Sequence, residues 1–304
     1  MSPAGGRGPR DPGPNGIAVV DKEAGWTSHD VVAKARGILG TRKVGHSGTL
    51  DPDATGVLLL GFGKVTRLLT YLTALSKSYV GEVVLGTETD TLDAAGQVTG
   101  THDMRAVTLE QARLAAEAFV GDIEQIPPMV SAVKIGGKRL HELARAGETV
   151  ERPPRPVTVH RLHLDEARPA TADEAMVLRI EVDCSSGTYI RTLADDLGHA
   201  LGGGAHLRNL RRTAIGSFGL DEARPLEQLE ILAPAVAMRD YPSRTVDDAV
   251  ASRITNGAVL PRAELGLTAA ESDGPWAVLS EAGDLLAVYE SRDLEWVKPA
   301  VVLA

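Results

Sequence analysis

The chain has 304 residues, of which 43% are hydrophobic, so it is long and apolar enough for one large domain and a second small one. A formal net charge of −9 argues against a general nucleic-acid binder, and the single cysteine, Cys184, excludes an intrachain disulfide. Residues 1–16 lack the apolar segment of a secretory signal and predict a disordered tail. No apolar run approaches the ~20 residues of a membrane span. We therefore expect a cytoplasmic monomer with no membrane contact.

The first predicted elements are a strand and a helix. Residues 17–22 form a short apolar strand that leaves the tail. Thr27 and Asp30 have the spacing of a capping box, and Gly40 provides a stop, so we expect a helix of about three turns between them.

A polar, glycine-rich loop at 45–56 then runs directly into the apolar stretch 57–61. Small residues and proline hold a loop in one shape and allow a ligand to approach the backbone. Pro52 also disfavours helical geometry at Asp51, which lies in the middle of the loop. From these residues alone, the loop is either an ordinary Asp-Pro turn or the site of a functional carboxylate.

The middle of the chain alternates between strand and helix patterns. Strands are predicted at 76–86 and 178–184, and a capping-box pattern opens a helix within 108–121. Thr192 has capping-box spacing with an acid three residues later and predicts a helix over 193–201. The segment 124–155 is basic and contains the proline pair 127–128 and the glycine pair 136–137, which is typical of an exposed mobile segment.

The C-terminal part is predicted to be a small module rich in strands. A helix is expected at 246–254, followed by strands at 276–280, 285–289 and 296–303. Charged residues are unevenly distributed, and the C-terminal part is also the most acidic part of the chain. Residues 221–304 carry 15 acidic and 7 basic side chains, whereas 134–161 carries 7 basic and 3 acidic ones. A basic stretch is either a solvated surface or a contact for RNA phosphates.

Several longer motifs resemble one known family. They are DKEAGWTSHDVV, GHSGTLDPDATGVLLL, KSYV with TETDTLD, CSSGTYIRTLADDLG and GGGAHLRNLRR. In this order and spacing they are similar to the motifs of the bacterial, stand-alone TruB-type tRNA pseudouridine synthases. The resemblance extends over about 17–220, and one family proline is Glu23 here.

The resemblance implies an α+β fold. A pseudouridine-synthase catalytic domain would span 17–240, with a mixed, mainly antiparallel sheet and an RNA-clamping insertion at about 124–155. A β-rich, PUA-like domain would follow at 241–304 and contact the acceptor side of tRNA.

The resemblance also implies an activity, the isomerisation of uridine to pseudouridine at position 55 in the T-arm of tRNA. Asp51 matches the catalytic nucleophile or base of the family, and Arg191 matches the arginine that pairs with it. Tyr79 would stack on the flipped base, Tyr189 and Leu210 would line its pocket, and His46 would contact the flipped nucleotide. This reaction needs no cofactor, and the histidines do not form a metal-ligand set.

The expected RNA contacts are basic residues in or near these motifs, namely Lys22, Lys64, Arg67, Lys134, Arg139, Arg208 and Arg211. For Lys64 and Arg67 the sequence equally allows the solvated side of a helix. An alternative function is that of a non-catalytic RNA-binding or tRNA-folding protein that uses the same cleft. A carboxylate facing an anionic ligand is not needed for binding alone, which favours the enzyme.

Overall fold

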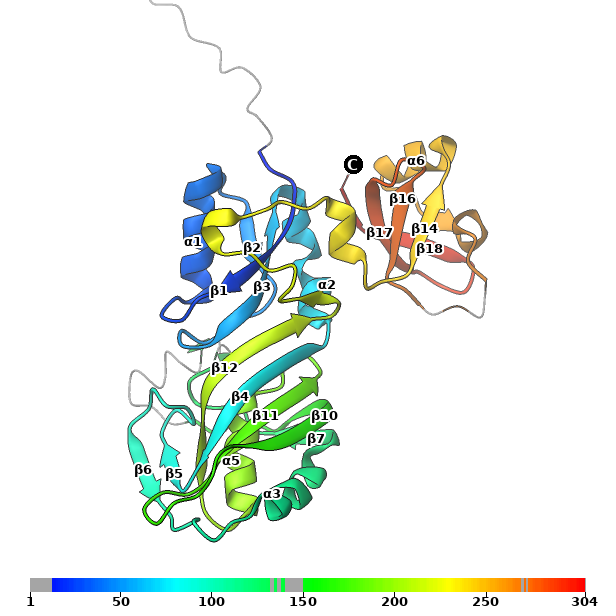
Figure 1. The fold of residues 1–304 in the computed structure, drawn as a ribbon. Coiled ribbons are helices and arrows are strands. Elements are labelled where there is room, and N and C mark those ends of the chain that lie inside the picture. The colour runs from blue at the N-terminus through cyan, green and yellow to red at the C-terminus, as the bar shows by residue number, and fades with distance from the viewer. Residues whose placement is uncertain are drawn as a thin grey trace, which may run out of the picture.

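The computed structural model describes residues 13–131, 150–268, 271 and 273–303, and the backbone of 134–135 and 138–139. Most of the predicted tail and the middle of the predicted 124–155 insertion lie outside the described residues. Within the described part, the strands form one large sheet and a smaller C-terminal sheet (Figure 1). No helix in this part of the chain is long and apolar enough to cross a membrane.

The large sheet is mixed and mainly antiparallel, as the resemblance of the motifs implies. Its nine described strands are β1 (Gly16–Lys22), β2 (Val44–His46), β3 (Thr55–Phe62), β4 (Lys77–Leu85), β7 (Gly121–Gln125), β10 (Arg155–Arg168), β11 (Val177–Cys184), β12 (Ala205–Ile215) and β13 (Phe218–Gly219). The order is β1-β3-β12-β4-β11-β10-β7, with β2 beside β3 and β13 beside β12. Strands β3 and β12 run parallel, and the other described pairs in this sheet are antiparallel.

Helices and short segments cover the large sheet and the C-terminal sheet. The described α-helices are α1 (Ser28–Leu39), α2 (Leu69–Ala74), α3 (Leu109–Ala116), α5 (Ile190–Ala200) and α6 (Asp248–Thr255). The 3-10 helices are η1 (Gly63–Leu68), η2 (Glu117–Phe119), η3 (Leu226–Gln228), η4 (Pro234–Met238) and η5 (Arg262–Leu265). Two small hairpins are β5 (Thr87–Thr89) with β6 (Val98–Thr101), and β8 (Lys134–Ile135) with β9 (Lys138–Arg139).

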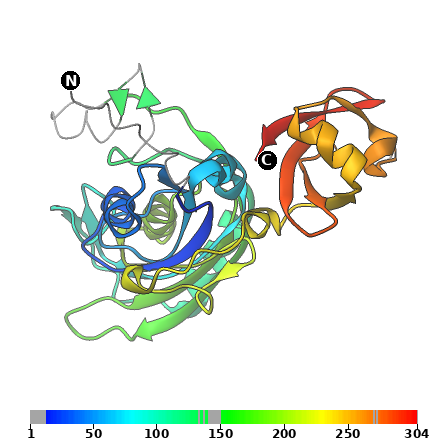
Figure 2. The ribbon, with the colours of Figure 1, turned by 90° about the horizontal axis from the view of Figure 1, so that it is seen from above.

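Among the described residues, three apolar cores lie against the large sheet, and one of them is shared with the C-terminal sheet. Helices α3 and α5 pack over strands β4, β10, β11 and β12 (Figures 1 and 2). This core includes Leu178 and Leu193. Helix α1 packs over β1 and β3, where Val31 and Leu58 are buried. Strands β1 and β3 are buried on both faces, which explains why residues 57–61 are a continuous apolar run.

The predicted capping box of α1 is confirmed. The Thr27 side chain accepts a hydrogen bond from the Asp30 backbone N–H, and the Asp30 carboxylate accepts one from the Thr27 N–H. Gly40 ends the helix in the left-handed region, at φ 61°.

The predicted start of the helix at 193 is wrong. Helix α5 begins at Ile190, and its N-cap is Tyr189, whose own side chain makes no capping bond. The buried Gln125 of β7 holds this N-cap residue instead: its side-chain oxygen accepts from the Tyr189 N–H at 2.9 Å, and its side-chain nitrogen donates to the Tyr189 carbonyl at 3.2 Å. Arg191 therefore lies in the first turn of α5, which fixes its direction.

The C-terminal sheet has five described strands and one covering helix. Its order is β14 (Ser243–Val246), β16 (Trp276–Ser280), β17 (Leu285–Ser291), β18 (Trp296–Val302) and β15 (Leu260–Pro261). The three predicted strands are present, but the helix expected from residue 246 starts at Asp248. Val246 instead ends β14, which pairs in parallel with β16, and Asp247 caps α6.

The two sheets meet at the segment that links β3 to β4. The Lys64 ammonium donates to the Leu303 carbonyl at 2.7 Å, and the Arg67 guanidinium donates to the Val302 carbonyl at 2.6 Å. Apolar side chains from both sheets form one shared core at this contact. Figure 1 shows the C-terminal sheet beside η1 and α2, away from the middle of the large sheet.

Candidate active site

Asp51 lies in the loop between β2 and β3, and buried polar groups hold this loop. The Lys22 ammonium donates to the Pro52 carbonyl at 2.9 Å, and Lys22 is 1% exposed. The fully buried Ser28 hydroxyl accepts from the Leu50 N–H at 2.8 Å. The backbone on both sides of Asp51 is therefore fixed before any ligand arrives.

Close contact with β12 explains a glycine at the end of this loop. Gly56 has φ of 100°, and a Cβ at this position would lie 2.1 Å from the carbonyl oxygen of Arg212. The buried Arg212 guanidinium also reaches back to the loop, with Nη2 3.3 Å from the Gly48 carbonyl and Nε 2.7 Å from the Val57 carbonyl. No other residue type would permit this approach of the two strands.

Asp51 and Arg191, the predicted catalytic pair, form an ion pair. Arg191 Nε lies 3.1 Å from Asp51 Oδ2, and Arg191 Nη2 lies 3.2 Å from Oδ1. The same guanidinium contacts Asp93 at 3.3 Å and donates to the carbonyls of Thr91 at 3.0 Å and Val130 at 2.8 Å. The Arg191 side chain is 6% exposed and the Asp51 side chain 39%, so the carboxylate is the open partner.

Burial and charge act on Asp51 in opposite directions. Desolvation raises the pKa of the Asp51 carboxyl above the ordinary value of 3.8, and the Arg191 guanidinium opposes this rise. The Asp93 carboxylate adds to the rise because it is a like charge. An ionised carboxylate with this balance is a stronger base than an exposed aspartate, which suits general-base or nucleophilic chemistry.

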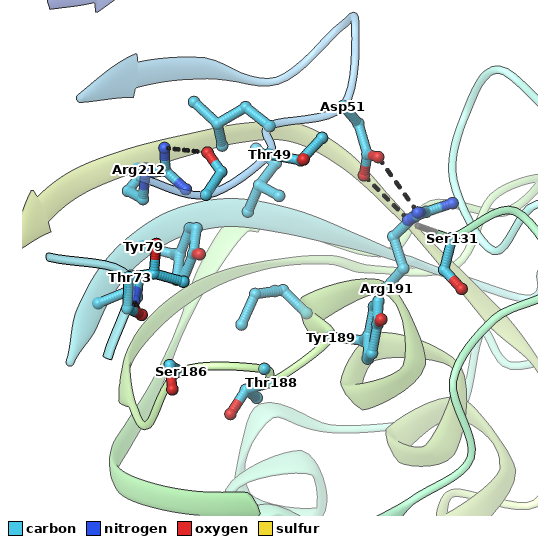
Figure 3. Close-up of a pocket in the computed structure, with 16 residues that line it drawn as sticks. Thr49, Asp51, Thr73, Tyr79, Ser131, Ser186, Thr188, Tyr189, Arg191 and Arg212 are labelled. Carbon is cyan, nitrogen blue, oxygen red and sulfur yellow. Dashed lines mark hydrogen bonds and ion pairs between the residues drawn. The ribbon is translucent and has the colours of Figure 1, made fainter. Parts of the chain in front are cut away.

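A cavity of about 260 Å³ lies against this pair and is lined by several of the predicted site residues. Tyr79, Tyr189 and Leu210 all line it, together with Asp51 and Arg191. Figure 3 shows the Asp51–Arg191 pair on one side of the cavity and the side chains of Tyr79 and Arg212 on the other. The volume is below the ~300–1,000 Å³ of clefts for drug-sized ligands, so one pyrimidine is a suitable occupant.

His46 is not among the residues that line this cavity. It packs edge-on against His29, with ring centroids 5.2 Å apart, and its Nδ1 accepts from the Gly48 N–H at 3.3 Å. Burial lowers the pKa of the His46 imidazole, so the ring is neutral at neutral pH. His46 therefore supports the Asp51 loop in the unliganded protein.

The structure corrects the role predicted for Lys22. Its ammonium donates to three carbonyls, those of Glu23, Trp26 and Pro52, and it lies beneath the loop surface. A buried group in this position does not reach RNA phosphates. Arg212, at the end of the motif that contains Arg208 and Arg211, is likewise buried, at 1% exposure.

The other residues predicted to contact RNA lie in different environments, and most of those that the structure describes already have a protein partner. Lys64 and Arg67 bind the C-terminal strand, as described above. Arg208 pairs with Glu82 and Arg211 with Asp21, each at 2.7 Å, and these two arginine side chains remain about one-third exposed, at 36% and 35%. The side chains of Lys134 and Arg139 lie outside the described residues.

Sequence reasoning missed Lys77 as a cavity residue. Lys77 is 6% exposed and lines the cavity two positions before Tyr79 on β4. Alternation along a strand places residues i and i+2 on the same face. This rule could have identified Lys77 once Tyr79 was taken as a base platform.

Comparison with known proteins identifies the family. The family model described as TruB family pseudouridylate synthase (N terminal domain) matches residues 36–190, and the one described as tRNA pseudouridylate synthase B C-terminal domain matches residues 191–248. The chain belongs to the TruB family of pseudouridylate synthases. The resemblance seen in the sequence motifs is therefore confirmed.

Relatives in the TruB family cover nearly the whole chain. The protein named tRNA pseudouridine synthase B from Arthrobacter sp. (strain FB24) is 46% identical over 95% of this chain and 97% of its own length. The protein of the same name from Streptomyces coelicolor is 46% identical over 92% of this chain and 94% of its own length.

Solved structures share the TruB-family fold. A chain in the "Crystal Structure of a Cbf5-Nop10-Gar1 Complex" has a TM-score of 0.71 at 26% identity, covering 94% of this chain and 83% of that chain. A chain in the "Structure of H/ACA RNP bound to a substrate RNA containing 2'-deoxyuridine" also has a TM-score of 0.71, at 23% identity, covering 95% and 85%.

Proposed function

We propose that this protein isomerises uridine to pseudouridine at position 55 in the T-arm of tRNA. Membership of the TruB family and relatives named tRNA pseudouridine synthase B support the substrate class. One structural observation carries the assignment of the site. The Asp51 carboxylate, held by Arg191 through two contacts, borders a cavity of about 260 Å³ that is also lined by Tyr79.

The reaction breaks the N1–C1′ bond of uridine and joins C5 of the same base to C1′. The C5 proton is lost and N1 gains one, so the product is an isomer and no redox partner is consumed. Asp51 is the catalytic group that acts as nucleophile or base at the sugar or base. Arg191 is a positioning residue, because it holds both carboxylate oxygens and favours the ionised form.

The target uridine must leave its loop to enter the cavity. Unstacking and unpairing a base costs a few kcal/mol, and stacking on an aromatic ring contributes roughly 1–3 kcal/mol per base. Tyr79 is the proposed stacking platform, and burial raises the pKa of its phenol, so the ring stays neutral. Tyr189 and Leu210 form the walls, and His46 contacts the nucleotide once it has flipped.

The remaining contacts follow the domain organisation. Residues 17–240 act as the catalytic domain, the segment 124–155 closes over the RNA, and residues 241–304 form the PUA-like domain. Arg208 and Arg211 bind phosphates, in exchange for or in addition to their present carboxylate partners.

The test is release of tritium from a T-arm transcript labelled at C5 of uridine. Wild-type protein releases tritium, and a transcript with cytidine at the target position, labelled at its other uridines, does not. Asp51→Asn abolishes release. Asp53→Asn removes an exposed carboxylate of the same loop and retains release within a few-fold. Release that persists in Asp51→Asn would remove Asp51 from the mechanism. Tight binding without release by wild type would favour the non-catalytic RNA-binding function.

A further inference from the structure

Two cationic side chains are buried at the cavity without a carboxylate partner. Lys77 is 6% exposed and Arg212 is 1% exposed, and both line the same cavity as Asp51. Among the described residues, neither forms an ion pair with an acid. Burying a charge without an opposite charge is costly, so such a pair beside an empty space calls for an explanation.

The fold brings these two cations to one face of the sheet. Lys77 and Tyr79 are two residues apart on β4, so they share a face. Arg212 on β12 is the register partner of Tyr79. The cations therefore adjoin the proposed base platform, and Figure 3 shows Arg212 on the side of the cavity opposite to Arg191.

Backbone carbonyls accept hydrogen bonds from two of the three N–H donors of the Lys77 ammonium. It donates to the carbonyls of Thr73 and Leu75 at the C-terminal end of α2, the second at 2.6 Å. An ammonium has three N–H donors, and no described residue accepts the third. Burial also lowers the pKa of Lys77 to about 8, so the charge is retained at neutral pH although it is costly. An exposed lysine or water can bind the carbonyls at a helix end equally well, so these two contacts do not explain why Lys77 is buried.

We propose that Lys77, with Arg212 beside it, stabilises the uracil anion that forms when the glycosidic bond breaks. This inference rests on the proposed isomerase function and extends it. When the N1–C1′ bond breaks, the bonding electron pair stays on N1, and Asp51 compensates C1′ either by adding to it or by taking a proton from the adjacent sugar carbon. The negative charge on the base spreads to the ring carbonyl oxygens. The third N–H of Lys77 donates to this anion. Recombination through C5 and transfer of the C5 proton consume the charge, so Lys77 itself neither gains nor loses a proton.

A change in the leaving group tests this role. Fluorine at C5 withdraws electrons and makes the detached base a weaker base, so it needs less stabilisation. Single-turnover loss of the substrate nucleoside is measured with a T-arm stem-loop that carries uridine or 5-fluorouridine at the target. Lys77→Met should slow uridine conversion about 100-fold, as for loss of one preorganised donor, with little change in RNA affinity. The defect with 5-fluorouridine should be at least several-fold smaller.

Matched variants separate the possible causes. Lys34→Met removes an exposed lysine of α1 and should leave both rates within about two-fold, as expected for a surface substitution. Lys77→Arg keeps the charge and should recover part of the uridine rate. Equal slowing of both substrates by Lys77→Met would mean that Lys77 only supports the structure, and unchanged rates would exclude any role. Failure of wild-type protein to convert uridine would instead overturn the proposed function.

A pH profile decides the question if Lys77→Met does not fold. Wild-type turnover should fall on the alkaline side as Lys77 loses its proton, near its pKa of about 8. Arginine stays protonated in this range, so Lys77→Arg should move this alkaline limb to higher pH. An alkaline limb that is the same in both proteins would overturn the proposal.

Discussion

Replacing Arg191 with alanine tests how the Asp51 carboxylate is controlled. The change removes two charge-assisted contacts to Asp51, at 3.1 and 3.2 Å, and leaves Asp51 beside Asp93 with only the weaker effect of the Lys22 charge to oppose it. Such hydrogen bonds contribute about 1.5–3 kcal/mol each. Because Asp51 is 39% exposed, the lower value applies, and the total of about 3 kcal/mol corresponds to a loss of roughly 100-fold in kcat/KM.

The pKa of Asp51 determines in which direction the pH profile of Arg191→Ala should shift. Burial already raises the pKa of Asp51, Arg191 lowers it, and Asp93 raises it. Removing Arg191 therefore raises the pKa of Asp51 further. The acid limb of kcat/KM, which in wild type lies above the ordinary aspartate value of 3.8, should move to higher pH in Arg191→Ala. Raising the pH should then restore part of the lost activity. Arg191→Lys keeps the charge but not the paired contacts, so its limb should move less.

The assay is tritium release from the labelled T-arm transcript between pH 5 and 8, at concentrations below saturation. Arg239→Ala is the matched control, because Arg239 makes a two-contact pair with Glu222 away from the cavity, at 2.5 and 2.7 Å. It should leave the acid limb in place. An Arg191→Ala limb that stays at the wild-type position, or moves to lower pH, would refute the account of Asp51.

Three further predictions follow from the structure. Tyr79→Ala should reduce kcat about 5- to 150-fold, which corresponds to the 1–3 kcal/mol of one stacked base, whereas Tyr79→Phe should retain most turnover; near-normal turnover in the alanine variant would exclude stacking. Gly56→Ala should lower the free energy of unfolding, measured in urea, by roughly 2–5 kcal/mol, because a side chain at this position combines a positive φ with overpacking. The control Gly25→Ala has φ of 82° but no atom within 4 Å, so it should lower this free energy by only about 1–2 kcal/mol. Equal losses would contradict the close approach of β3 and β12. In the double variant Lys64→Met with Arg67→Met, the free energy of unfolding should fall by about 2 kcal/mol, and protease should cut the chain between η3 and β14. An unchanged digestion pattern would show that the contact between the two sheets does not need these residues.

Local patterns in the sequence predicted the elements whose signals are local. The capping box of α1, the strand at 178–184 and the C-terminal hairpin all depend on residues within a few positions of each other. The predicted start of α5 was wrong because its N-cap residue, Tyr189, is held by Gln125, 64 residues earlier. No pattern within the helix itself contains that information.

The candidate site was also predicted where local motifs specify it and not where it depends on contacts distant in the sequence. The motifs predicted the Asp51–Arg191 pair and the positions of Tyr79, Tyr189 and Leu210 at one cavity. They did not predict that Lys22 and Arg212 are buried, because a charge in a glycine-rich or basic motif normally lies at the surface. Only the packing of the Asp51 loop against the end of β1 and against β12 shows that these cations bind carbonyls within the protein.

The core shared by the two sheets has a consequence for synthesis of the chain on the ribosome. Ile17 of β1 packs in the same apolar cluster as Val301 of β18 and Leu303. This apolar cluster is therefore not complete until residues near 300 have left the exit tunnel. A nascent or prematurely terminated chain exposes the part of the cluster that the C-terminal sheet covers, and a chaperone or a protease would bind there first.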